Sequence, residues 1–247
     1  MPLLKEFVTA LNSVTQLWMF DFDNTIARLE PEVDWAGGRR VLEPYLRSVG
    51  APEELFARIP RGNLLLYDAY RTLLVSGGSL DGFATEKLRH ASEIIETIEL
   101  AGAGRAVPLE GAIELLELVK RTGAQVAIVT SNSSRTVERW FDVRGVAPRE
   151  AIVDAIIGRD TLLGLKPAPD MVLRALELFS AEPSTAAFVG DSEADLAAAR
   201  SAGIRFYGVA STEPARDRLL AAGAENIFSS PAALAIHLNL FGGFSRS

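Results

Sequence analysis

Short apolar segments alternate with helical patterns through the second half of the chain. The apolar segments are rich in β-branched and aromatic residues and are bounded by turn residues, which is typical of buried strands. They lie at 127–130, 151–157, 186–190, 204–210 and 226–228, and an earlier segment, LWMF, lies at 17–20. The segments between them have helical spacing, and several end at a glycine, at 110–123, 133–145, 169–180, 193–203 and 214–224. This alternation predicts a parallel sheet with helices on both faces.

Residues from about 30 to 105 follow a different pattern. They show helical spacing and no convincing strand, with candidate helices at 38–50, 52–59, 63–78 and 81–100. We therefore expect an α/β fold with a Rossmann-like parallel-sheet core, formed by 1–29 and 106–247, and a small all-helical cap domain at 30–105, inserted after the first strand. The first 14 residues are predicted to form a short amphipathic helix.

Composition limits the classes of partner. Hydrophobic residues make up 48% of the 247 residues, which is enough for a globular core. The net charge is −7 and there is no basic tract, so nucleic acid is not expected as a partner. Cysteine is absent, which excludes disulfides, thiolate zinc sites and cysteine nucleophiles. No apolar run approaches the roughly 20 residues that span a membrane, so we expect a cytoplasmic protein without a membrane partner. The expected oligomeric state is a monomer or homodimer.

Polar residues follow three of the predicted strands, and a lysine precedes one of the predicted helices. Ligands of open parallel sheets bind at the carboxyl ends of the strands, where these segments should meet. The candidate site residues are Asp21, Asp23, Thr130, Ser131, Asn132, Lys166, Asp191 and Asp195.

These residue types together suit the binding of a metal ion and a phosphate group. A cluster of carboxylates requires a cation, and hard oxygen ligands of this kind suit Mg²⁺. The Thr130 hydroxyl and the backbone N–H groups that follow it, at the start of a predicted helix, suit phosphate oxygens. Lys166 can neutralise both a phosphate and a neighbouring carboxylate. In this setting Asp21 is a plausible nucleophile, because an aspartate can form an aspartyl-phosphate.

Four motifs in order carry a resemblance to a known family. They are DFDNT at 21–25, IVTSN at 128–132, KPAPD at 166–170 and GDSEAD at 190–195. With them the sequence resembles the haloacid dehalogenase superfamily of phosphohydrolases, in particular phosphoglycolate phosphatase-like members with a helical cap. The resemblance covers roughly 15–25 and 108–230. It implies a Mg²⁺-dependent phosphatase that acts on a small phosphorylated metabolite, such as phosphoglycolate, a sugar phosphate or a nucleotide.

The resemblance also implies a role for each catalytic position. Asp21 would attack phosphorus, and Asp23 would protonate the leaving oxygen and then activate water. Thr130 would bind the transferring phosphoryl group, with Ser131 as the alternative ligand. Lys166 would stabilise the developing charge and hold the Asp21 carboxylate.

The remaining implied roles concern the substrate and the metal. Thr130, Ser131, Asn132 and Lys166 would bind the substrate. The metal ligands would be Asp21, the backbone carbonyl of Asp23, Asp191, and Asp195, which would ligate through water or orient the loop.

Two departures from the family pattern bear on the activity. Asn24 stands where glycine is the commonest residue, a variant that phosphatase members tolerate. Dehalogenases lack the second aspartate, so Asp23 argues against dehalogenation. A phosphomutase on the same scaffold and a catalytically silent binding protein are the alternatives.

Overall fold

The core of the molecule is a six-stranded parallel sheet. The computed structural model describes residues 15–76, 81–145, 149–238 and 240, so the helix predicted for the first 14 residues lies outside the described part. The strand order is β5-β4-β1-β6-β7-β8. The strands are β1 (Leu17–Phe20), β4 (Gln125–Val129), β5 (Ala155–Ile157), β6 (Ala186–Gly190), β7 (Arg205–Val209) and β8 (Ile227–Phe228). β1 pairs with β4 on one side and with β6 on the other, so the first motif follows a central strand.

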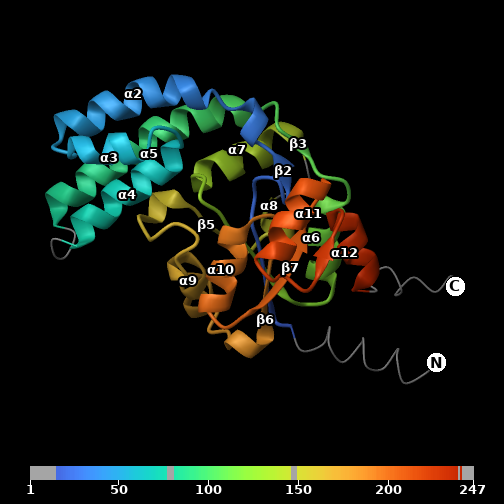
Figure 1. The fold of residues 1–247 in the computed structure, drawn as a ribbon. Helices are drawn as coiled ribbons and strands as arrows, with labels where there is room; N and C mark the ends of the chain where they lie inside the picture. The colour runs from blue at the N-terminus through green and yellow to red at the C-terminus, as the bar shows by residue number, and fades with distance from the viewer. Residues whose placement is uncertain (1–14, 77–80, 146–148, 239, 241–247) are drawn as a thin grey trace, which may run out of the picture.

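Helices cover both faces of this sheet, as the sequence predicts (Figure 1). The alternation within β1 shows why, because Leu17 and Met19 join one apolar cluster while Trp18 and Phe20 join the other. One cluster is closed by α9 (Asp170–Leu178), α10 (Glu193–Ser201) and α11 (Glu213–Ala221). The other is closed by α6 (Ala112–Arg121), α7 (Ser134–Arg144) and α12 (Pro231–His237).

A helical insertion follows the first strand, and the described residues of 30–105 contain no strand. Its helices gather at one end of the molecule, beyond the sheet (Figure 1). They are α2 (Trp35–Ser48), α3 (Glu53–Arg58), α4 (Asn63–Ser76) and α5 (Gly82–Ala103), preceded by the short 3₁₀ helix η1 (Glu30–Glu32). The longest of them, α5, packs against α7 of the sheet layer. The α/β class with a helical segment after the first strand is therefore confirmed.

Two features differ from the sequence prediction. The segment 151–157 is not one strand: α8 (Arg149–Ile152) ends before Asp154, and β5 begins after it. The Asp154 carboxylate accepts a hydrogen bond from the Val126 N–H at 2.7 Å and pairs with Lys120, so this residue is committed to a turn. The second feature is an antiparallel pair, β2 (Ala27–Arg28) with β3 (Val107–Pro108), which is too short to show a period in the sequence.

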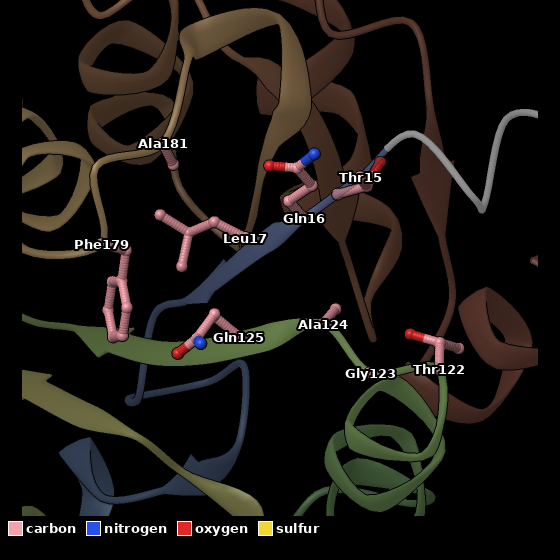
Figure 2. A pocket seen from close by; sticks show the side chains of 9 residues that line it. All are labelled: Thr15, Gln16, Leu17, Thr122, Gly123, Ala124, Gln125, Phe179 and Ala181. Atoms are coloured by element: carbon pink, nitrogen blue, oxygen red, sulfur yellow. The ribbon is translucent and has the colours of Figure 1, made fainter.

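A cavity of about 380 Å³ lies at the amino-terminal ends of β1 and β4 (Figure 2). This edge is opposite to the one where ligands bind in open parallel sheets, and we assign no function to the cavity. Its lining residues are Thr15, Gln16, Leu17, Thr122, Gly123, Ala124, Gln125, Phe179 and Ala181.

Trp140 is the side chain whose loss should most weaken the layer behind the first motif. It is fully buried, its ring meets Phe22 edge-on at 5.5 Å, and its indole N–H donates to the Ala106 carbonyl at 2.8 Å. Trp140→Ala should lower the free energy of unfolding by about 3–5 kcal/mol, measured by urea denaturation. Trp140→Phe, which keeps a ring, should lose clearly less, and equal losses for the two variants would contradict this packing role.

Candidate active site

Lys166 joins two motifs at the carboxyl edge of the sheet. Its ammonium contacts the Asp21 carboxylate and lies 2.6 Å from Oδ1 of Asp195. It also donates to the Val129 carbonyl, the last of β4, at 3.2 Å. The Lys166 side chain is only 5% exposed. Burial would lower its pKa, but Asp195 and Asp21 outweigh that effect and raise it, so the ammonium stays charged.

Three carboxylates converge around this ammonium. One oxygen from each of Asp21, Asp191 and Asp195 lies within 4.8 Å of the others. Burial, together with the charges of its acidic neighbours, raises the pKa of Asp191 to about 9, and burial raises that of Asp21 to about 7. A divalent cation between these carboxylates would stabilise their ionised form and lower their pKa values. A donor set made only of oxygen atoms suits Mg²⁺.

Asp195 is also a structural part of the loop after β6. Its Oδ2 accepts hydrogen bonds from the Asp191 N–H at 3.2 Å and from the Ser192 N–H at 3.0 Å. Ser192 caps α10 and completes a capping box with Asp195. One oxygen therefore orients the loop while the other faces Lys166.

Asp23 points to a different place from Asp21. Its Oδ1 accepts hydrogen bonds from the N–H groups of Leu29 at 2.9 Å and Glu30 at 3.0 Å. Burial raises its pKa to about 6, which is suited to a group that gives and takes a proton. Phe22 between the two acids is fully buried. Asn24 has φ of 57°, in the left-handed region where asparagine is among the best-tolerated non-glycine residues, which accounts for this departure from the family pattern.

The loop after β4 is held tightly. The buried Thr130 hydroxyl donates to Oδ1 of Asn132 and accepts from its N–H, both at 3.1 Å. Ser133, not Thr130, caps α7 by accepting from the Thr136 N–H. The Asn132 amide donates to Glu99 of α5 at 2.9 Å, so this side chain is committed within the protein. Ser131 is the most exposed of the three residues of this loop that are predicted to bind the substrate.

A cavity of about 380 Å³ lies between Asp23 and the helical insertion. The sequence singled out none of the insertion residues around it, because exposed apolar and polar side chains on a helix surface are common. Its lining residues are Asp23, Glu30, Trp35, Gly62, Asn63, Leu64 and Leu65. Two buried charged residues, Glu99 and Arg159, were likewise not predicted to belong near the site.

Residues 18–209 match the family model of haloacid dehalogenase-like hydrolases. The chain belongs to this family. It is 29% identical over 194 residues to phosphoglycolate phosphatase 1 of Pseudomonas aeruginosa, covering 77% of this chain and 67% of that protein. It is 28% identical over 200 residues to protein CbbY of Rhodobacter capsulatus, covering 76% and 82%. The prediction of a hydrolase of this superfamily with phosphoglycolate phosphatase-like relatives is confirmed, and these relatives support the class of phosphoric monoester hydrolases.

Solved structures agree on the fold of this family member. CbbY from Rhodobacter sphaeroides in complex with phosphate superposes with a TM-score of 0.59 at 24% identity, over 89% of this chain and 96% of that one. The L-2-haloacid dehalogenase of Xanthobacter autotrophicus superposes with a TM-score of 0.58 at 17% identity, over 94% and 100%. At these identities the likeness shows the fold alone. Among the described residues, no helix is long and apolar enough to cross a membrane.

The carboxylate cluster should make the metal-free protein less stable as the pH rises. The folded pKa values of Asp23, Asp21 and Asp191 lie above 3.8, so the folded chain binds protons that the unfolded chain has lost. The free energy of unfolding in EDTA should therefore fall as the pH rises from about 4 through about 9. Urea denaturation at a series of pH values measures this slope.

Two variants separate this effect from general charge removal. Asp191→Asn should stabilise the metal-free protein at about pH 8 by roughly 0.5–2 kcal/mol, and by less at about pH 5. Asp217→Asn, on the exposed surface of α11, should change little at either pH. A destabilising effect of Asp191→Asn at the higher pH would contradict the raised pKa of Asp191 and its cause, burial beside other acids.

Proposed function

We propose that the protein is a Mg²⁺-dependent phosphatase that hydrolyses a small phosphomonoester through an aspartyl-phosphate on Asp21. The observation that carries the proposal is the buried contact of Lys166 with Asp21 and Asp195, with Asp191 beside them. A nucleophilic carboxylate, a fixed cation and two further acids are the parts that phosphoryl transfer requires.

In the first step the Asp21 carboxylate attacks phosphorus, and the bond from phosphorus to the leaving oxygen breaks as the new bond forms. Asp23 is the general acid that gives its proton to that oxygen. Its raised pKa supports this role, because burial preserves a protonated fraction near neutral pH. Lys166 offsets the negative charge that gathers on Asp21 and the phosphoryl oxygens.

In the second step the Asp23 carboxylate removes a proton from water, and the water oxygen attacks phosphorus. The bond from phosphorus to the Asp21 oxygen breaks, which releases inorganic phosphate and restores the carboxylate. The hydrogen bonds from Leu29 and Glu30 support this exchange of roles, since they hold the Asp23 side chain in one orientation in both steps.

The loop after β4 and the acidic cluster complete the proposed site. Thr130, Ser131 and Asn132, together with Lys166, would surround the phosphoryl group. Mg²⁺ would be held by Asp21, Asp191, Asp195 and the backbone carbonyl of Asp23, and when bound it supplies positive charge against both the acids and the phosphate. The convergence of the carboxylate oxygens within 4.8 Å for three of these residues supports this assignment.

We further propose that residues 30–105 act as a cap domain over a core of 1–29 and 106–247. The cavity beside Asp23 supports this division, because its other lining residues belong to the insertion. The leaving group would lie there, against Trp35 and Leu65, since its oxygen must meet the Asp23 carboxyl. The names of the relatives support a small phosphorylated metabolite as substrate, with phosphoglycolate as the first compound to assay.

Asp21→Asn tests the nucleophile. The variant should fold normally and lose Mg²⁺-dependent hydrolysis of 4-nitrophenyl phosphate by about 10³-fold or more, because the amide cannot attack phosphorus. Asp217→Asn should retain full activity as the matched control. Activity of Asp21→Asn within tenfold of the wild type would overturn the mechanism, and wild-type activity only with a bisphosphate activator would favour a phosphomutase.

Asp23→Asn tests the general acid through the leaving group. With an alkyl phosphate, whose leaving alkoxide needs a proton, kcat/KM should fall by about 10²–10⁴-fold. With 4-nitrophenyl phosphate, whose leaving group is stable as an anion, the loss should be clearly smaller. Equal losses with both substrates, measured under identical Mg²⁺ concentrations, would show that Asp23 does not protonate the leaving oxygen.

A further inference from the structure

An ion pair with no exposed surface joins the helical insertion to the core. Glu99 of α5 and Arg159 of the 3₁₀ helix η2 (Arg159–Thr161) are both 0% exposed. Their two parallel contacts measure 2.8 Å for Nη1 to Oε1 and 2.9 Å for Nη2 to Oε2. Such a buried pair adds little net stability over apolar side chains, because both charges lose their hydration. The catalytic steps above use neither residue.

Arg159 has no unused donor. Its Nε donates to the Ser92 hydroxyl at 3.1 Å, and its Nη2 donates to the Ser92 carbonyl at 3.2 Å. Its Nη1 donates to the Ser131 carbonyl at 2.9 Å, in addition to Glu99. Together with the two contacts to Glu99, these bonds occupy all the N–H groups of the guanidinium. The side chain therefore ties α5 directly to the loop after β4.

Glu99 reaches the same loop from the side of α5. Its Oε1 accepts from the Asn132 amide at 2.9 Å. Its Oε2 accepts from the Ser133 N–H at 3.2 Å and from the Thr136 hydroxyl at 3.3 Å. A carboxylate of the insertion thus fixes both the side chain of Asn132 and the first turn of α7.

The residues on either side of Arg159 are fitted to the loop as well. A Cβ atom at Gly158 would lie 2.5 Å from the Ser134 nitrogen and 2.8 Å from the Asn132 carbonyl oxygen, which only glycine avoids. Asp160 Oδ1 accepts from the Ser134 N–H at 2.7 Å. The Arg159 N–H donates to the Asn132 carbonyl at 2.9 Å. The segment 158–160 therefore docks on the loop through three successive residues.

We propose that Glu99 and Arg159 are positioning residues that hold the loop 131–133 in the conformation that receives the phosphoryl oxygens. The part that concerns phosphate rests on the proposed function. Because Glu99 and Ser92 belong to α5, displacement of α5 from the core breaks the bonds that order the loop. The phosphate site is then complete only when α5 is docked on the core. The position of the insertion therefore controls phosphate binding, although none of the proposed catalytic residues belongs to the insertion.

Two variants break the ion pair in different ways, so that misfolding of one does not prevent the test. Glu99→Gln keeps the shape but leaves Arg159 without a charged partner. The double variant Glu99→Met with Arg159→Met replaces both charges by apolar groups, an exchange that buried ion pairs often tolerate. Arg135→Gln is the matched control, because it alters a second ion pair between α5 and α7, which joins the exposed Arg135 to Glu96 at 2.7 Å.

Amide hydrogen exchange over 131–136 and the inhibition constant of inorganic phosphate with Mg²⁺ are the readouts. We expect both pair variants to exchange at least tenfold faster in this segment and to bind phosphate at least tenfold more weakly. KM should rise alike for good and poor leaving groups, while the Arg135→Gln control matches the wild type.

Variants that fold but keep wild-type exchange and phosphate inhibition would overturn the inference. Faster exchange without weaker phosphate binding would also overturn it, because the pair would then be structural only. A wild-type protein that neither binds nor releases phosphate would instead refute the proposed function, and exchange over 131–136 would still decide whether Glu99 and Arg159 order the loop.

Discussion

The site depends on one buried ammonium between carboxylates. Lys166 contacts Asp21 and lies 2.6 Å from Asp195, and without its charge three acids would share a small buried volume with nothing to offset their repulsion. Even beside this ammonium, burial and the charges of the neighbouring acids raise the pKa values of Asp21 and Asp191. A second positive charge, such as a bound divalent cation, would favour the ionised form of these acids. Binding of that cation would therefore also stabilise the folded protein.

Asp21 and Asp23, the two acids of the first motif, differ in what they contact. Asp21 directly follows β1, and the buried Phe22 between the two acids packs in the same apolar cluster as Trp18 and Phe20. Asp21 meets Lys166, whereas Asp23 meets the N–H groups that precede the insertion. Burial raises the pKa of both acids, to about 7 for Asp21 and about 6 for Asp23, so their different contacts, an ammonium against backbone N–H groups, are what separates them. Two aspartates one residue apart can thus hold different functions.

The fold and the convergence of the motifs could be predicted from the sequence because both follow from short-range patterns. Alternation of strands and helices predicts the sheet, and the carboxyl ends of parallel strands meet at one edge, which brings Asp21, Thr130 and Asp191 together. The strand predicted at 151–157 was half wrong, because an apolar run of that length does not distinguish a strand from a helical turn.

The Glu99–Arg159 pair could not be predicted for a different reason. Its partners are 60 residues apart, and an arginine in a loop or a glutamate on a helix normally lies in solvent. The contacts of Asp23 were equally hidden, since its carboxylate accepts from the N–H groups of Leu29 and Glu30, six and seven residues further along the chain. Tertiary geometry, not local pattern, decides both features.

A covalent phosphoryl group on Asp21 is the central claim, and rapid acid quench followed by peptide mass spectrometry tests it most directly. The wild-type protein would be mixed with Mg²⁺ and a phosphomonoester and stopped within its first turnovers. The account predicts one added phosphoryl group on the peptide that contains Asp21, in a linkage that hydroxylamine removes. Phosphate release without any phosphorylated peptide, or with the group on another residue, would contradict it.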